Sequence, residues 1–198
     1  VIIQVSRNAL QYADKGLLAA MVRYMAEEKY PHIPMSLHLD HGPDIETIKE
    51  CVALGFTSVM IDGSLDYSTK DEKGSHPVRS FDDNVAITKE AVEIAHEAGV
   101  TVEGEIGTLG GIEDDTVAGG VHLTEPDEAE EFVKQTGIDA LAIAIGTSHG
   151  AYKFPVGTEA KLALDIVDDV HSRCPDISLV MHGSSSVPAH MVEEVNKY

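Results

Sequence analysis

Histidines and carboxylates recur in this chain directly after short runs of aliphatic residues. The polar groups at these six positions are Ser6, Asp40-His41, Asp62, Glu103 with Glu105, Ser148-His149-Gly150 and His182-Gly183-Ser184-Ser185. One histidine in such a place is usually a hydrogen-bonded structural residue, but three in equivalent places, with carboxylates between them, favour a metal site. His41, His149 and His182 could supply three nitrogens to a catalytic ion with an open position for substrate. Zinc suits these ligands, and cobalt and iron are alternatives.

The aliphatic runs alternate with longer amphipathic segments, which is typical of βα units around a parallel sheet. The predicted strands are 1–6, 34–40, 58–63, 100–107, 140–146 and 178–183. The predicted helices are 16–29, 44–54, 81–98, 126–135, 158–173 and 187–197. Because the carboxyl ends of parallel strands share one edge, we expect the polar groups to converge there.

The run at 140–146 places Leu141, Ile143 and Ile145 on one face and alanines on the other. That pattern indicates one face against helices and the other against a crowded interior. We predict one α/β domain over 1–198 with the (β/α)8 TIM-barrel fold, represented by about six βα units, with a first and a last unit missing. An open, doubly wound six-stranded sheet is the alternative. The segments 64–80 and 108–124 are predicted to be long irregular loops with functional roles.

The composition limits the partners. The chain has 34 acidic and 14 basic side chains and a net charge of -20, which argues against binding to nucleic acids or anionic membranes. Adaptation to high salt and an ordinarily acidic enzyme both remain open as reasons for this charge. No apolar run suggests a membrane span or secretion signal. Cys51 and Cys174 lack metal-binding spacing and are predicted to be free thiols in a reducing cytoplasm.

The other histidines and the glycine turns each allow more than one role. His38 shares a strand face with Asp40, so it either orients a metal ligand or is structural. The turns after His149 and His182 could bind phosphate through backbone N–H groups and hydroxyls. The alternative is that Ser185 or Ser186 simply caps a helix. Four histidines are predicted to face solvent: His32, His96, His171 and His190.

Five segments together resemble one family. They are LHLDHG at 37–42, SVMIDGS at 58–64, VEGEIG at 102–107, GTSHGAYK at 146–153 and VMHGSSS at 180–186. The chain resembles the class II, metal-dependent fructose-1,6-bisphosphate aldolases from Val1 to Tyr198. The resemblance implies a lyase that reversibly cleaves fructose-1,6-bisphosphate to dihydroxyacetone phosphate and glyceraldehyde-3-phosphate, in glycolysis, gluconeogenesis or the Calvin cycle. It also implies a homodimer or homotetramer.

The resemblance assigns roles around the metal. It makes His41, His149 and His182 the zinc ligands, and Glu105 a further ligand or part of an alternative metal position near Asp62. Asp40 resembles the catalytic aspartate that takes the proton from the C4 hydroxyl. The metal then stabilises the enediolate charge left by carbon–carbon cleavage, so no Schiff-base lysine is needed.

Other assignments concern the substrate. Glu113 resembles the loop glutamate that moves the C3 proton, although it could be one acid in an acidic loop. Ser6, Gly150, Gly183 and Ser185 match phosphate-side positions, where the family also binds a monovalent cation, and Lys153 resembles a lysine near one phosphate. The family's last strand, with its Asn-x-Asp-Thr motif, and the arginine beyond it have no counterpart before Tyr198. The expected site therefore has its metal ligands and about half of its substrate contacts.

Three other functions remain open from the sequence. One is a tagatose-1,6-bisphosphate aldolase of the same family, because C4 stereochemistry cannot be inferred from these motifs. The second is a barrel metallohydrolase that activates water at the same histidines. The third is an inactive or interaction-only fragment.

Overall fold

The computed structural model describes residues 1–198 except 73–74, 114–115, 119–121 and 150–161. Six parallel strands form the main sheet in the order β1-β2-β3-β5-β8-β10. Their bounds are β1 (Ile2–Ser6), β2 (Ser36–Gly42), β3 (Ser58–Ile61), β5 (Thr101–Ile106), β8 (Ala140–Ile143) and β10 (Ser178–Val180). All six predicted strands are confirmed. The order follows the sequence without the reversal that a doubly wound sheet requires, so that alternative is wrong.

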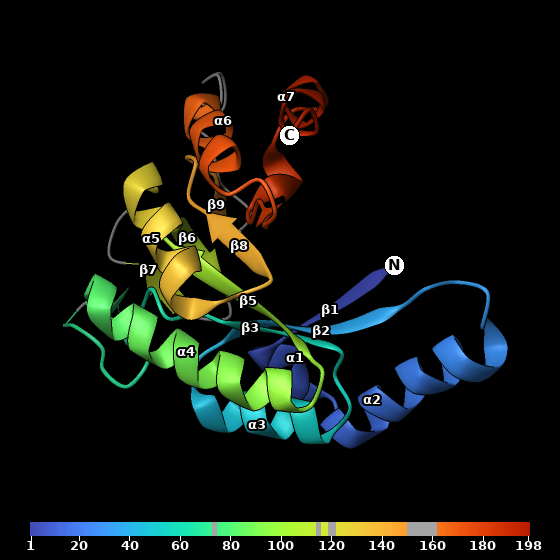
Figure 1. Ribbon diagram of the computed structural model, residues 1–198. Coiled ribbons are helices and arrows are strands. Elements are labelled where there is room, and N and C mark those ends of the chain that lie inside the picture. Colours follow the sequence, from blue (N-terminus) through green and yellow to red (C-terminus); the bar gives the residue numbers. More distant parts are fainter. Residues whose placement is uncertain (73–74, 114–115, 119–121, 150–161) are drawn as a thin grey trace.

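Helices α3 (Ile45–Ala53), α4 (Phe81–Glu97), α5 (Pro126–Thr136) and α6 (Leu164–Arg173) cover one face of this sheet in chain order (Figure 1). Side chains cap α3 and α4, since Asp44 accepts from the Thr47 N–H and Ser80 accepts from the Asp83 N–H. The larger side chains of the strands pack against these helices in one buried cluster, which includes Leu39, Val102, Leu141, Ile143, Phe132 and Val170. Polar side chains of β2 and β5 alternate with these apolar ones and therefore point to the other face.

Several helices begin or end at residues other than those predicted. The helix expected over 16–29 is α2 (Lys15–Tyr24), followed by a π-helical turn, η1 (Met25–Lys29). Helix α1 (Arg7–Tyr12) was not predicted, because its six residues are too few to establish a periodic pattern. Of the helix expected over 158–173, residues 158–161 lie outside the described residues, and α6 begins at Leu164. Near the end, a 3-10 turn, η2 (Ser184–Ser186), precedes α7 (Ala189–Val195). None of the described helices is long and apolar enough to cross a membrane.

A second, smaller sheet lies beyond the carboxyl ends of the main strands. Its order is β4-β7-β6-β9, with bounds β4 (Ser75–His76), β6 (Gly110–Glu113), β7 (Thr116–Ala118) and β9 (Ser148–His149). Strand β4 lies within the segment 64–80, β6 and β7 lie within 108–124, and β9 follows β8 along the chain. The prediction that those segments are irregular was wrong at these short strands. Strands of two to four residues are too short to show alternation, and their pairing partners are distant in sequence.

Candidate metal centre

A β-bulge at the end of β2 determines where Asp40 and His41 point. The pairing of β2 with β3 shifts by one residue between Leu39 and Gly42, and His41 has a left-handed φ of 48°. In a regular strand, neighbouring side chains point to opposite faces, so Asp40 and His41 would diverge. The bulge turns both toward the carboxyl edge, where Asp40 Oδ1 lies 3.9 Å from His41 Nε2. The left-handed conformation of a non-glycine residue costs about 1–2 kcal/mol.

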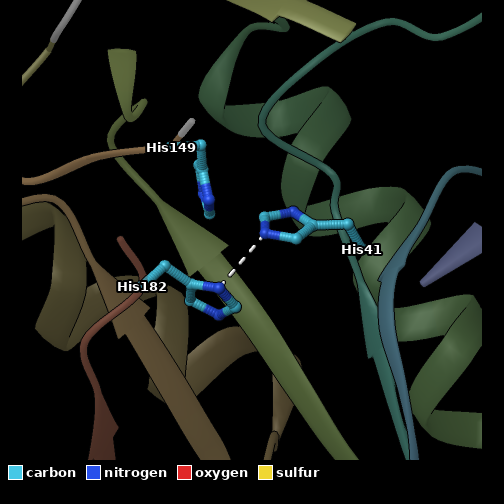
Figure 2. A group of neighbouring side chains, drawn as sticks. All are labelled: His41, His149 and His182. Atoms are coloured by element: carbon cyan, nitrogen blue, oxygen red, sulfur yellow. Dashed lines mark hydrogen bonds between the residues drawn. The ribbon is translucent and has the colours of Figure 1, made fainter. Parts of the chain in front are cut away.

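Three imidazole rings converge at this edge, as Figure 2 shows. His41 is the penultimate residue of β2, His149 lies in β9 of the second sheet, and His182 follows β10. The ring centroids are 5.0 Å apart for His41 and His149, 4.6 Å for His41 and His182, and 5.8 Å for His149 and His182. His41 Nε2 lies 3.1 Å from His182 Nδ1. Two nitrogens bound to one tetrahedral zinc at about 2.0–2.1 Å would be about 3.3 Å apart, so the residues fit a metal of this kind.

Glu103 bonds to the nitrogen of His182 that faces away from His41. His182 Nε2 is 2.8 Å from Glu103 Oε1, and both residues are buried. This leaves Nδ1 of His182 facing His41 and Asp40, which is the usual carboxylate–histidine–metal arrangement. Burial lowers the pKa of His182, but the hydrogen bond to Glu103 contributes to a net rise. Glu103 was among the strand-end carboxylates but had no predicted role; its signal was its position two residues from Glu105 on the same strand face.

His38 extends this arrangement into the interior. It is buried, its Nδ1 bonds to Ser58 Oγ at 2.8 Å, and its Nε2 lies 3.6 Å from Glu103 Oε2. Burial lowers the pKa of His38, so the neutral form is favoured. His38 therefore lies beside the carboxylate that bonds to His182, and its role as an orienting residue stays a prediction.

Asp62 and Glu105 lie on the other side of His41. His41 Nδ1 is 3.3 Å from Asp62 Oδ2 and 3.8 Å from Glu105 Oε2. These three residues form a second group that could hold a metal, and it shares His41 with the first group. A single neutral imidazole offers one lone pair, so His41 supplies one group at a time.

His41, Asp62 and Glu105 change one another's pKa values through their charges and hydrogen bonds. Burial lowers the pKa of His41, but the hydrogen bond to Asp62 and the nearby carboxylates outweigh it and raise the pKa well above 6.5. Burial raises the pKa of Asp62, yet the interaction with His41 lowers it overall. Burial and the charge of Asp62 together raise the pKa of Glu105. Among the described residues, buried oxygens of Asp40 and Glu105 have no hydrogen-bond partner, which is what a cation or a substrate hydroxyl would supply.

The predicted phosphate-side residues lie near the same edge where they are described. Ser6 caps α1 and pairs with Asp40 in the register of β1 and β2. Gly183 has a φ of 68°, and a Cβ there would lie 2.7 Å from Ser148 O, so the turns after β8 and β10 touch. Ser185 is exposed in η2. The N-cap position of α7 is occupied by Pro188 rather than by a serine.

Three predicted site residues remain: Glu113, Gly150 and Lys153. The backbone of Glu113 lies in β6 and pairs with Thr116, and the next strand, β9, carries His149. Gly150 and Lys153 lie outside the described residues. Of the histidines expected to face solvent, His32, His96 and His190 are exposed and His171 is half-buried.

The fold and geometry define a class of α/β protein. Its parallel sheet carries, at the carboxyl edge of the strands, a histidine-rich group that could hold a metal. The family model for "Fructose-bisphosphate aldolase class-II" matches residues 1–198. The chain belongs to the class II fructose-bisphosphate aldolase family, whose members are metal-dependent enzymes.

Relatives of known name agree with this assignment. A fructose-bisphosphate aldolase from Giardia intestinalis is 52% identical over 198 residues, which is all of this chain and 56% of that protein. One from Pseudomonas aeruginosa is 46% identical over 213 residues, covering all of this chain and 58% of that protein. A crystal structure of a putative fructose-1,6-biphosphate aldolase from Coccidioides immitis has a TM-score of 0.82 and 30% identity, over 100% of this chain and 64% of that one. The chain thus spans little more than half the length of these curated relatives.

Proposed function

We propose that this chain supplies the metal site of an aldolase that reversibly cleaves fructose-1,6-bisphosphate to dihydroxyacetone phosphate and glyceraldehyde-3-phosphate. The observation that carries the proposal is the position of Asp40. Its Oδ1 is buried and lies 3.9 Å from His41 Nε2 and 3.8 Å from His182 Nδ1. A carboxylate beside convergent imidazoles is the arrangement needed for proton transfer next to a Lewis acid.

The proposed metal is Zn²⁺, held by His41, His149 and His182, where it would stabilise negative charge developing on the substrate carbonyl oxygen. Asp40 takes the proton from the C4 hydroxyl as the C3–C4 bond breaks, and the C4 oxygen becomes the aldehyde carbonyl. Glu113 returns a proton to C3 of the three-carbon product. Both steps run in reverse for condensation.

The phosphate contacts belong to the same proposal. Ser6, Gly183 and Ser185 would bind one phosphate through hydroxyl and backbone N–H groups, together with Gly150 and Lys153 and a monovalent cation. The contact between Gly183 and Ser148 supports this, since it brings two of the turns together.

Wider expectations rest on the family and remain proposals. They are a complete (β/α)8 barrel, a homodimer or homotetramer, a cytoplasmic location, and a role in glycolysis, gluconeogenesis or the Calvin cycle. The unbroken parallel order of the six strands supports the barrel.

The test is a coupled assay of cleavage with fructose-1,6-bisphosphate and tagatose-1,6-bisphosphate, before and after EDTA and after added zinc. It is run on this chain and on a version extended to the length of its relatives. We expect chelator-sensitive cleavage of the fructose ester that zinc restores. Activity indifferent to EDTA would refute the proposed chemistry, and preference for the tagatose ester would change the substrate. Zinc binding without cleavage in the extended version would favour an inactive protein.

A further inference from the structure

The Asp62 carboxylate accepts four hydrogen bonds. Oδ1 accepts from the Ser64 N–H at 3.1 Å and from the Ser64 hydroxyl at 2.6 Å. Oδ2 accepts from the Tyr67 hydroxyl and faces His41 Nδ1 at 3.3 Å. An ionised carboxylate has about four lone-pair positions and no donor, so His41 must carry its proton on Nδ1. Asp62 then has no lone pair left for a metal, and His41 presents Nε2 toward His182.

Tyr67 is held in place by the second sheet. Its ring lies 4.9 Å from that of His76, centroid to centroid. His76 is buried in β4, and its Nδ1 bonds to the Thr69 carbonyl at 2.7 Å. Strand β4 pairs with β7, which pairs with β6, which pairs with β9, the strand of His149. The second sheet therefore carries His149 and also positions the Tyr67 hydroxyl, which bonds to the carboxylate beside His41.

We propose that Tyr67 is a positioning residue that selects the metal position: its hydroxyl occupies Asp62 Oδ2 and so keeps the ion at the three imidazoles. This inference rests on the proposed metal site. Without the hydroxyl, one lone pair of Oδ2 becomes available. The carboxylate can then turn from His41 toward an ion shared with Glu105, whose Oε2 is buried and lacks a hydrogen-bond partner among the described residues. The group of His41, Asp62 and Glu105 then competes with the three imidazoles.

The test compares Tyr67→Phe with the unaltered chain by direct metal binding. Zinc affinity is measured by competition with a chromophoric chelator, and the site is characterised by the visible spectrum of bound Co²⁺. We expect zinc affinity to fall about 3- to 10-fold, because an Asp62 carboxylate that turns toward Glu105 no longer orients His41 for the three-imidazole site. Outright removal of a group bonded to a metal ligand typically costs about 10- to 100-fold. The Co²⁺ absorption should weaken as a carboxylate oxygen joins the coordination. Tyr24→Phe, which removes a hydroxyl from an exposed ring, is the matched control and should change neither quantity.

A double-mutant cycle shows whether Tyr67 acts through Asp62. In an Asp62→Asn background, Tyr67→Phe should change zinc affinity less than about twofold, because the carboxylate that it controls is gone. The inference is overturned if Tyr67→Phe keeps the affinity and the Co²⁺ spectrum of the unaltered chain, or if its full effect persists in that background. If the unaltered chain itself binds no zinc, the proposed metal site fails as well. Far-UV circular dichroism of each variant distinguishes loss of fold from loss of positioning.

Discussion

Replacing Glu103 by glutamine should weaken zinc binding about tenfold. Glu103 Oε1 accepts from His182 Nε2 at 2.8 Å, and neither side chain is exposed to solvent. A hydrogen bond with a charged partner contributes about 1.5–3 kcal/mol, against about 0.5–1.5 kcal/mol for a neutral pair. Glutamine keeps an acceptor and the side-chain volume but loses the charge that makes Nδ1 of His182 a stronger donor to the metal. The midpoints of these ranges differ by about 1.3 kcal/mol, which corresponds to a nearly tenfold change in dissociation constant.

The assay is equilibrium competition for zinc with a chromophoric chelator at neutral pH. Glu93→Gln, at an exposed position on α4, removes the same charge from the chain far from the site and should leave affinity unchanged. The thermal melt of metal-free Glu103→Gln identifies any general loss of stability. If this variant binds zinc as tightly as the unaltered chain, or if Glu93→Gln weakens binding equally, then the hydrogen bond to His182 does not support the metal and our reading of the geometry is refuted.

Three further predictions concern stability. The folded-state pKa values of Glu105 and His41 are both raised, so the folded chain holds more protons than the unfolded chain above the ordinary values of 4.5 and 6.5. The melting temperature of the metal-free chain should therefore fall from about pH 6 to about pH 9, and a rise over that window would contradict these shifts. Gly183→Ala should lower the free energy of unfolding in urea by about 1–2 kcal/mol or more, because φ is 68° and the new Cβ would meet Ser148 O. An unchanged urea midpoint would show that the turn adapts to the added Cβ. Asn84→Ala should cost about 1–3 kcal/mol, since the buried Asn84 amide donates to the Glu105 carbonyl at 2.9 Å, and a loss under 0.5 kcal/mol would mean that water replaces it.

The sequence determined the main sheet because each strand carries its own pattern. Leu141, Ile143 and Ile145 alternate with alanines, and the structure buries the larger residues against α5 and α6. Spacing also placed His41, His149 and His182 at strand ends, and parallel strands bring such ends to one edge. These features depend on local alternation and on one topological rule, so they can be read without coordinates.

Tertiary structure decided the orientation of the site. The bulge that turns His41 beside Asp40 depends on the pairing of β2 with β3, and the second sheet depends on strands too short to show a period. The bonds from Glu103 to His182 and from Tyr67 to Asp62 join residues whose contact no local pattern encodes. Sequence alone therefore indicated which side chains could bind a metal. Only packing fixed which nitrogen His41 and His182 present, because that choice is made by the partner on the opposite side of each ring, Asp62 for His41 and Glu103 for His182.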